Sequence, residues 1–167
     1  MAILDILSYP DPRLYTVAKP VAQVDSKIKQ LVEDMAETMY AAPGIGLAAT
    51  QVNVHQQVIV IDISETKDQL QVFINPVIKT KNGSQEYEEG CLSVPDQYAE
   101  VERPATIRAR WQDLDGKVHE EEMEGLMATC LQHEMDHLEG ILFIVHLSRL
   151  KRQMVLKKLE KQRKTAA

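Results

Sequence analysis

The chain has 167 residues, of which 44% are hydrophobic and 26% are charged, so its length fits one folded core better than two. Its two cysteines are too few for a disulfide framework, and the amino-terminal segment does not resemble a secretion signal. Polar or charged residues interrupt every apolar run before it is long enough to cross a bilayer. We therefore expect a cytoplasmic monomer without a membrane span.

The net charge of −6 is unevenly distributed. From Arg149 onward, eight Lys or Arg stand against one acid, Glu160, so this segment carries +7 and the rest of the chain carries −13. A basic segment on an acidic body predicts that a polyanion such as ribosomal RNA would meet the chain at its carboxyl-terminal end. A solvated amphipathic helix without any RNA contact is the alternative.

The opening segment is rich in proline, which predicts an extended or turn-rich conformation over residues 1–24. Asp25 is a suitable helix cap, and the apolar spacing after it predicts a helix. Pro43 and Gly44 then end this helix.

Four stretches predict strands because they are rich in Val and Ile or alternate in polarity. They span residues 57–63, 71–78, 106–111 and 117–123. Asp115-Gly116 predicts a hairpin turn between the last two, and Asn82-Gly83 predicts another turn.

Two further helices are predicted in the last third of the chain. The first begins near Gly125 and ends around Gly140, since glycine suits the left-handed position after a helix. The second begins near Ser148 and carries the basic residues. Strands flanking a central helix, with helices toward both ends, predict an α+β fold with antiparallel or mixed β-sheets. We expect residues 1–147 to form one catalytic domain, with residues 148–167 as its basic helical tail.

The stretch QHEMDHLEG places His133 and His137 on one face of the predicted central helix. Two imidazoles at this spacing can hold one metal ion, and Glu134 between them can act as a general base. The pattern is short, so a helix with two ordinary histidines is the alternative.

A catalytic metal ion usually has a third protein ligand. Phe143 stands where a metzincin protease has its third histidine, and Glu160 lies in a basic, solvated helix. Cys130 shares the helix face, but seven residues of helix separate it from His137 by about 10 Å. It is expected to pack nearby as a small buried residue. Cys91, in the stretch EEGCLSVP, remains as the third ligand, and a merely buried cysteine is the alternative.

The stretch GIGLAATQ, residues 44–51, has two glycines but lacks the third glycine of a dinucleotide-binding loop and the Lys-Ser/Thr pair of a P-loop. A phosphate-binding role is therefore excluded in favour of close approach by a substrate main chain. Gln51 ends the stretch with an uncharged amide donor, which suits a developing oxyanion.

Together these three stretches resemble the signature motifs of peptide deformylases, in the order and at the separations of that family. The similarity covers essentially the whole chain, including the helical tail of bacterial members. It implies a hydrolase that removes the N-formyl group from the initiator methionine of nascent peptides and releases formate. It also implies Fe²⁺ as the bound ion, with Ni²⁺, Co²⁺ or Zn²⁺ able to occupy the same site.

The resemblance further implies a role for each residue of the three stretches. The implied metal ligands are Cys91, His133 and His137. Glu134 would be general acid and base, and the oxyanion would be stabilised by the Gln51 side chain and the Leu92 backbone N–H. The residues implied to contact the peptide are Gly44, Ile45, Gly46, Tyr87, Glu89, Gly90, Leu126, Thr129 and Cys130.

The chain departs from the family pattern at two positions beside this implied peptide site. Tyr98 stands where many members have arginine, and Tyr87 stands where bacterial members often have Ile or Val. Side-chain preference beyond methionine is therefore open.

Two other functions compete with deformylation. A metalloprotease would cut unformylated peptides internally, but Phe143 removes its expected third ligand. An RNA-binding module would use the basic tail on the ribosome, which is compatible with deformylation of emerging chains.

Overall fold

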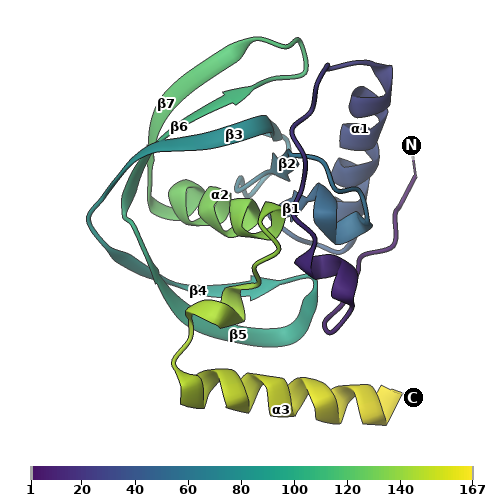
Figure 1. The fold of residues 1–167 in the computed structure, drawn as a ribbon, viewed down its shortest axis with the longest axis vertical. Coiled ribbons are helices and arrows are strands. Elements are labelled where there is room, and N and C mark those ends of the chain that lie inside the picture. The colour runs from purple at the N-terminus through teal and green to yellow at the C-terminus, as the bar shows by residue number, and fades with distance from the viewer. Residues whose placement is uncertain (1, 167) are drawn as a thin grey trace.

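The computed structural model describes residues 2–166, which form an α+β fold with antiparallel sheets as predicted (Figure 1). The α-helices of this part of the chain are α1 (Ser26–Ala41), α2 (Gly125–Leu138) and α3 (Arg149–Ala166). One sheet has five strands in the order β1-β2-β3-β6-β7, and the other is the two-stranded hairpin β4-β5. The strands are β1 (Gly46–Ala48), β2 (Val58–Ile61), β3 (Gln71–Asn82), β4 (Gln85–Cys91), β5 (Val94–Arg103), β6 (Thr106–Gln112) and β7 (Val118–Glu124).

Strand β2 is buried on both faces. Ile59 and Ile61 belong to the core layer that includes residues of α2, whereas Val58 and Val60 belong to the layer that includes residues of α1. A strand covered on both sides needs no polar face, which explains its unbroken run of Val and Ile. The five-stranded sheet thus separates two hydrophobic layers.

Helix α2 lies between the five-stranded sheet and the hairpin β4-β5 (Figure 1). His133, Glu134 and His137 are at most 6% exposed on this helix. Burial of ionisable side chains is unfavourable unless they are paired, neutralised or bound to a metal. The position of α2 therefore already marks these residues as candidates for function.

Helix α3 packs against the body through a third hydrophobic cluster. Its Val155 and Leu159 are buried with Val94 and Val101 of β5 and with the 3₁₀ segment Phe143–His146. The basic tail is therefore anchored by an apolar face. No helix among residues 2–166 is long and apolar enough to span a bilayer.

Most predicted elements are confirmed within a few residues. The Asp25 side chain accepts hydrogen bonds from the backbone N–H groups of Lys27 and Ile28, and so caps α1. Gly116 and Gly140 adopt the left-handed conformation at the predicted turn and helix end, with φ of +79° and +76°. Strand β3 is longer than predicted, and a register irregularity between Ile74 and Val77 accommodates its internal proline.

Strands β4 and β5 were not predicted. The stretch from Gln85 to Arg103 is rich in Glu and contains Gly and Pro, which have low β-propensity. Packing of its apolar side on the segments after α2 outweighs that local preference. The missed hairpin is the element that presents Cys91 to α2.

Candidate active site

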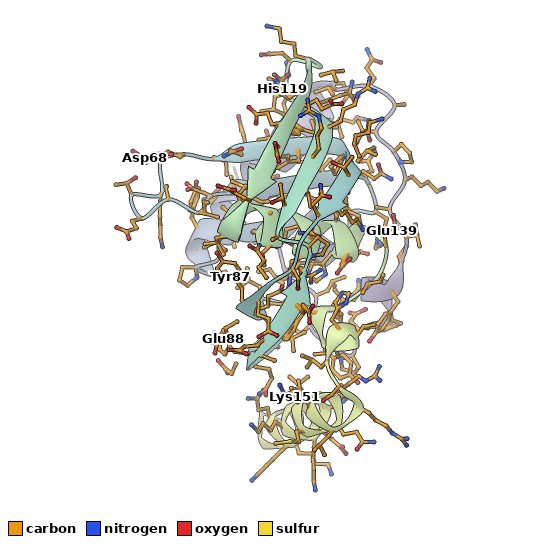
Figure 2. All side chains as sticks on the ribbon, turned by 90° about the vertical axis from the view of Figure 1, so that its left-hand side faces the viewer. Asp68, Tyr87, Glu88, His119, Glu139 and Lys151 are labelled. Carbon is orange, nitrogen blue, oxygen red and sulfur yellow. The ribbon has the colours of Figure 1, made fainter. Side chains whose placement is uncertain are left out.

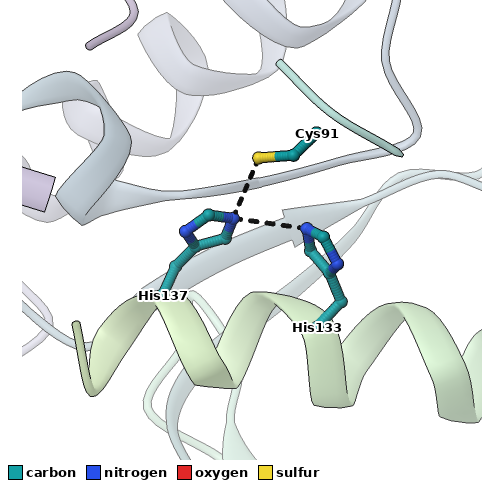
Figure 3. Close-up of side chains that lie close together, drawn as sticks. All are labelled: Cys91, His133 and His137. Atoms are coloured by element: carbon teal, nitrogen blue, oxygen red, sulfur yellow. Dashed lines mark hydrogen bonds between the residues drawn. The ribbon is translucent and has the colours of Figure 1, made fainter. Parts of the chain in front are cut away.

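Three potential metal ligands converge from two elements (Figure 3). His133 and His137 lie one turn apart on α2, and Cys91 lies at the end of β4. The Cys91 Sγ atom is 3.2 Å from His137 Nε2, which is 3.3 Å from His133 Nε2. All three ligand atoms lie within 4.8 Å of one another, so one ion can be shared among them.

The chemistry of this donor set fits a divalent transition metal ion. One thiolate and two imidazoles are ligands that zinc, iron, cobalt and nickel accept in proteins. The Nδ1 atom of His133 is 2.8 Å from Glu89 Oε1, so this nitrogen donates to the carboxylate and leaves Nε2 free to bind a metal. Cys130 lies outside the cluster, as predicted from its helical spacing.

The Gln51 side chain is held in one orientation beside the ligands. Its Oε1 accepts a hydrogen bond from the Ala48 backbone N–H at 3.0 Å. Its Nε2 donates to Ser93 Oγ at 3.1 Å and lies 3.5 Å from Cys91 Sγ. Gln51 is 1% exposed, so its amide is held in a fixed position beside the three potential metal ligands.

Glu134 is buried but incompletely satisfied. Its Oε1 atom has no hydrogen-bond partner among the described residues. Burial raises the pKa of this carboxyl to about 7. A group with this pKa can both accept and return a proton near neutral pH.

Gly46 gives Glu134 the space that it occupies. A Cβ atom at this position would lie 2.6 Å from Glu134 Oε2 and 3.0 Å from Cys130 Sγ. Glycine at this position is therefore explained by the close approach of β1 to α2. It is not explained by backbone conformation, since Gly46 does not have a positive φ.

A buried ionic network holds His133, one of the potential metal ligands. The Arg103 guanidinium donates to both Glu89 oxygens at 2.6 and 2.9 Å and to Asp136 at 2.9 Å. Burial raises the pKa of Glu89, but hydrogen bonds from His133 and Arg103 outweigh it and hold that pKa below its usual value. His146 lies nearer the surface, and its Nε2 is 2.8 Å from Asp136 Oδ2.

This network was only partly foreseen. Glu89 was predicted to contact the peptide, but its carboxylate is bound to His133 and Arg103 and lies outside the active-site cavity. No local pattern marks Arg103, because it lies in the unpredicted strand β5. Glu89 therefore holds the His133 imidazole, and Arg103 holds Glu89.

Two of the three potential ligands, Cys91 and His133, line a cavity of about 680 Å³ between the segment after α1 and the hairpin β4-β5. Nine residues that were predicted for the site line this cavity: Gly44, Ile45, Gly46, Gln51, Gly90, Cys91, Leu92, His133 and Glu134. Residues that the sequence analysis did not assign to it include Pro43, Glu88 and Asp96.

Besides Glu89, four residues expected at the peptide site lie outside the lining of this cavity. They are Tyr87, Leu126, Thr129 and Cys130. Thr129 Oγ1 accepts a hydrogen bond from Gln85, and Cys130 is buried close to Gly46. Their contact with a methionine side chain stays a prediction.

Comparison with known proteins decides the family. The model of the family described as polypeptide deformylase matches residues 3–153. The chain belongs to the peptide deformylase family. A peptide deformylase from Novosphingobium aromaticivorans is 61% identical over 188 aligned positions, which cover 99% of this chain and 100% of that protein. The peptide deformylase from Saccharophagus degradans is 60% identical, in an alignment that covers 100% of this chain and 98% of that protein.

Solved deformylase structures have the same fold. The crystal structure of the Legionella pneumophila enzyme superposes with a TM-score of 0.93 at 46% identity, covering 99% of this chain and 98% of that one. The Synechococcus elongatus deformylase, solved in complex with actinonin, has a TM-score of 0.89 at 41% identity and covers 93% of this chain and 86% of that one. This chain is thus a hydrolase of the deformylase family, whose members depend on a metal ion.

Proposed function

We propose that this chain uses a metal ion held by Cys91, His133 and His137 to remove the N-formyl group from newly made formyl-methionyl peptides. The convergence of one thiol and two imidazoles, next to a cavity that Gln51 and Glu134 also line, carries the proposal. The metalloprotease alternative loses support because Phe143 is 1% exposed in the core, with its ring stacked near that of His133.

Fe²⁺ is the proposed ion, with Ni²⁺, Co²⁺ and Zn²⁺ as possible occupants of the same ligands. The free thiol of Cys91 and a ferrous ion both require reducing conditions, which fits the proposed cytoplasmic location. When bound, a divalent ion supplies Lewis-acid chemistry, which lowers the pKa of water and polarises a carbonyl oxygen.

Glu134 is proposed to move the proton. Glu134 lines the cavity, its Oε1 has no hydrogen-bond partner among the described residues, and its pKa of about 7 allows it to take a proton from the attacking water. The same carboxyl then returns that proton to the nitrogen of the leaving amine, which frees the peptide from formate.

Gln51 and Leu92 are proposed to stabilise the oxyanion that forms as water adds to the formyl carbon. The Gln51 amide is fixed by Ala48 and Ser93, so its reorientation on reaction is small. Preorganised neutral donors stabilise developing negative charge without first being stripped of water. The Leu92 backbone N–H follows Cys91 directly and supplies the second proposed donor.

The peptide main chain is proposed to lie along Gly46 and Gly90. Among the described strands, β1 is an edge strand that pairs only with β2, so a peptide can add to its open side. The methionine side chain would then approach the pocket residues predicted from the family. Those residues are Ile45, Tyr87, Leu126, Thr129, Cys130 and His133.

We also propose that the chain acts as a monomer and meets its substrate at the ribosome through α3. The outer side of this helix carries basic residues, including Lys151 (Figure 2), while its apolar side is anchored on β5. Basic side chains on a fixed helix suit contact with phosphate groups of ribosomal RNA.

Formate release from a formyl-Met peptide tests the proposed reaction. The protein should be purified without oxygen, and its metal content measured in the same sample. Formate production with about one ferrous ion per chain, as expected for three ligands around one ion, would support both the reaction and the metal. A metal-filled protein that releases no formate but cuts an unformylated peptide internally would overturn the proposal.

A further inference from the structure

A buried carboxylate that has no part in the proposed reaction lies next to the wall of the active-site cavity. Asp62 directly follows β2 and is 2% exposed. Its Oδ2 accepts hydrogen bonds from the Tyr40 hydroxyl at 2.6 Å and from the Gln69 backbone N–H at 3.1 Å. Its Oδ1 accepts hydrogen bonds from the backbone N–H and the hydroxyl of Ser64. The Asp62 side chain therefore connects the end of α1 to the loop after β2.

The backbone of Asp62 holds the start of β1. Its N–H donates to the Ile45 carbonyl oxygen at 2.8 Å, which extends the β1-β2 pairing by one residue beyond Gly46 and Ile61. Hydrogen-bonded and non-hydrogen-bonded pairs alternate along an antiparallel pair of strands. Because Ile45 bonds to Asp62, the next residue, Gly46, directs its own backbone N–H and C=O to the open side of β1. The peptide main chain is proposed to lie on that side.

Asp62 thus holds one wall of the cavity at two points. The wall is the segment 42–46, and every residue of this segment lines the cavity. Tyr40 precedes the segment on the last turn of α1 and is bound by the Asp62 side chain, whereas Ile45 lies within the segment and is bound by the Asp62 backbone. A short connection that is held at both ends has fewer conformations than one that is held at a single end.

The hydrogen bond between Tyr40 and Asp62 joins a neutral donor to a charged acceptor. Hydrogen bonds from Ser64 and Tyr40 lower the pKa of Asp62 to about 2. Burial, together with the hydrogen bond to Asp62, raises the pKa of Tyr40 to about 12. Near neutral pH the carboxyl is therefore ionised and the phenol keeps its proton. Hydrogen bonds of this kind are short, as the 2.6 Å separation is, and are stronger than those between neutral groups.

We propose that Tyr40 and Asp62 are positioning residues, which hold the segment 42–46 so that the Gly46 backbone is aligned with the main chain of the bound peptide. The inference rests on the proposed deformylase function and names residues, away from the metal ligands, on which peptide binding depends. Both residues lie outside the lining of the cavity, so they act through the segment and not by touching the substrate. Binding groups that are already fixed lose less conformational freedom when a ligand binds.

Two substrates of different length test the inference in Tyr40→Phe, which removes one hydroxyl and keeps the ring. Formyl-Met methylamide offers little main chain to β1, whereas formyl-Met-Ala-Ala amide offers more. The wild type should prefer the longer substrate in kcat/KM, and Tyr40→Phe should reduce this length preference by about three- to ten-fold, the range that one hydrogen bond supplies. The change should appear in KM for the longer substrate, with kcat nearly unchanged, because ground-state and transition-state binding weaken alike.

Two further variants and a metal measurement complete the experiment. Tyr15→Phe is the matched control, because the Tyr15 hydroxyl makes no hydrogen bond within residues 2–166, and it should keep the length preference of the wild type. Asp62→Asn weakens the hydrogen bonds to the carboxylate while keeping its shape, so it should reduce the length preference as Tyr40→Phe does. Metal content should be the same in all of these proteins, since none of the substitutions removes a potential ligand.

The outcomes separate this inference from the proposed reaction. If Tyr40→Phe slows both substrates by the same factor or loses metal, the hydroxyl has only a general structural role and the inference is wrong. An unchanged length preference in Tyr40→Phe or Asp62→Asn, or a wild type that has none, would also overturn it. In each of these cases formate release leaves the reaction standing. No formate from either substrate with metal-filled wild type would overturn both the reaction and the inference.

Discussion

At the scale of single residues, Cys91 and Glu134 line the same cavity, and their proposed roles can be separated by substitution. Cys91→Ala removes one of the three proposed ligands, so we expect metal content to fall together with activity. Glu134→Gln keeps all ligands and removes the proton carrier, so we expect near-normal metal content and a kcat lower by about 10²- to 10⁴-fold. Metal analysis and formate release on the same samples check both. Full metal occupancy and normal rate in Cys91→Ala would contradict the ligand assignment.

Arg103 shows how a single buried charge stabilises the site from outside it. Arg103→Met leaves the Glu89 carboxylate without its guanidinium in a buried position, where it is 5% exposed. Removing one partner of a buried ion pair typically costs about 3–5 kcal/mol of the free energy of unfolding, and urea denaturation would measure it. Arg108→Met is the control, since its ion pair with Glu120 is exposed and should contribute much less. Equal losses of unfolding free energy in the two variants would show that the buried network stabilises the protein no more than the exposed ion pair does.

At the scale of elements, the end of α2 depends on a glycine for two separable reasons. Gly140 has φ of +76°, and a Cβ there would lie 2.5 Å from the Tyr15 carbonyl oxygen. Gly116, in the β6-β7 turn, has φ of +79° but no atom within 4 Å of the same position. Both Ala variants should lose roughly 1–2 kcal/mol of stability from the left-handed backbone.

Gly140→Ala should lose more than Gly116→Ala, because the Tyr15 backbone must also move. Urea denaturation of both variants measures the difference. If Gly140→Ala lowers the free energy of unfolding no more than Gly116→Ala does, the backbone at Tyr15 moves away at no energetic cost. The interpretation of that contact as a fixed support for α2 would then be wrong.

At the scale of the whole molecule, α3 combines structural support with the proposed ribosome contact. Deleting residues 148–167 would expose the partners of Val155 and Leu159, each worth roughly 1.5–3 kcal/mol of burial. Because those partners include β5, truncation is expected to lower thermal stability as well as any ribosome binding. Truncation alone is therefore a poor test of the ribosome contact.

Charge substitutions on α3 separate the two roles. Lys151→Ala with Lys158→Ala removes two exposed charges and spares the apolar face, so formate release from a small peptide should not change. Co-sedimentation with ribosomes should weaken, and its salt dependence should fall by about one unit of slope per lost phosphate contact. The control is Lys79→Ala with Lys81→Ala, which removes equal charge from β3. Equal ribosome binding by the two double variants would contradict docking through α3.

The sequence by itself determined the features that depend on local patterns. Spacing along one helix brought His133 and His137 together, and capping and turn residues fixed the bounds of α1, α2 and the β6-β7 turn. Elimination of the other candidates, and the family resemblance, pointed to Cys91 before any fold was known. The structure confirms that Cys91, His133 and His137 converge, and their metal binding stays a prediction. Their convergence could be predicted because each residue lies in a motif that is itself local.

Only the tertiary structure decided what depends on packing between distant segments. The hairpin β4-β5 has low local β-propensity, so its pairing, and with it the placement of Arg103 and Tyr98, follows from the surfaces that it covers. The sequence also did not predict that the Glu89 carboxylate binds His133 and lies outside the cavity lining; contact of Glu89 with a substrate stays a prediction. A one-dimensional pattern carries no information about which side of an unpredicted strand faces a helix formed more than thirty residues later.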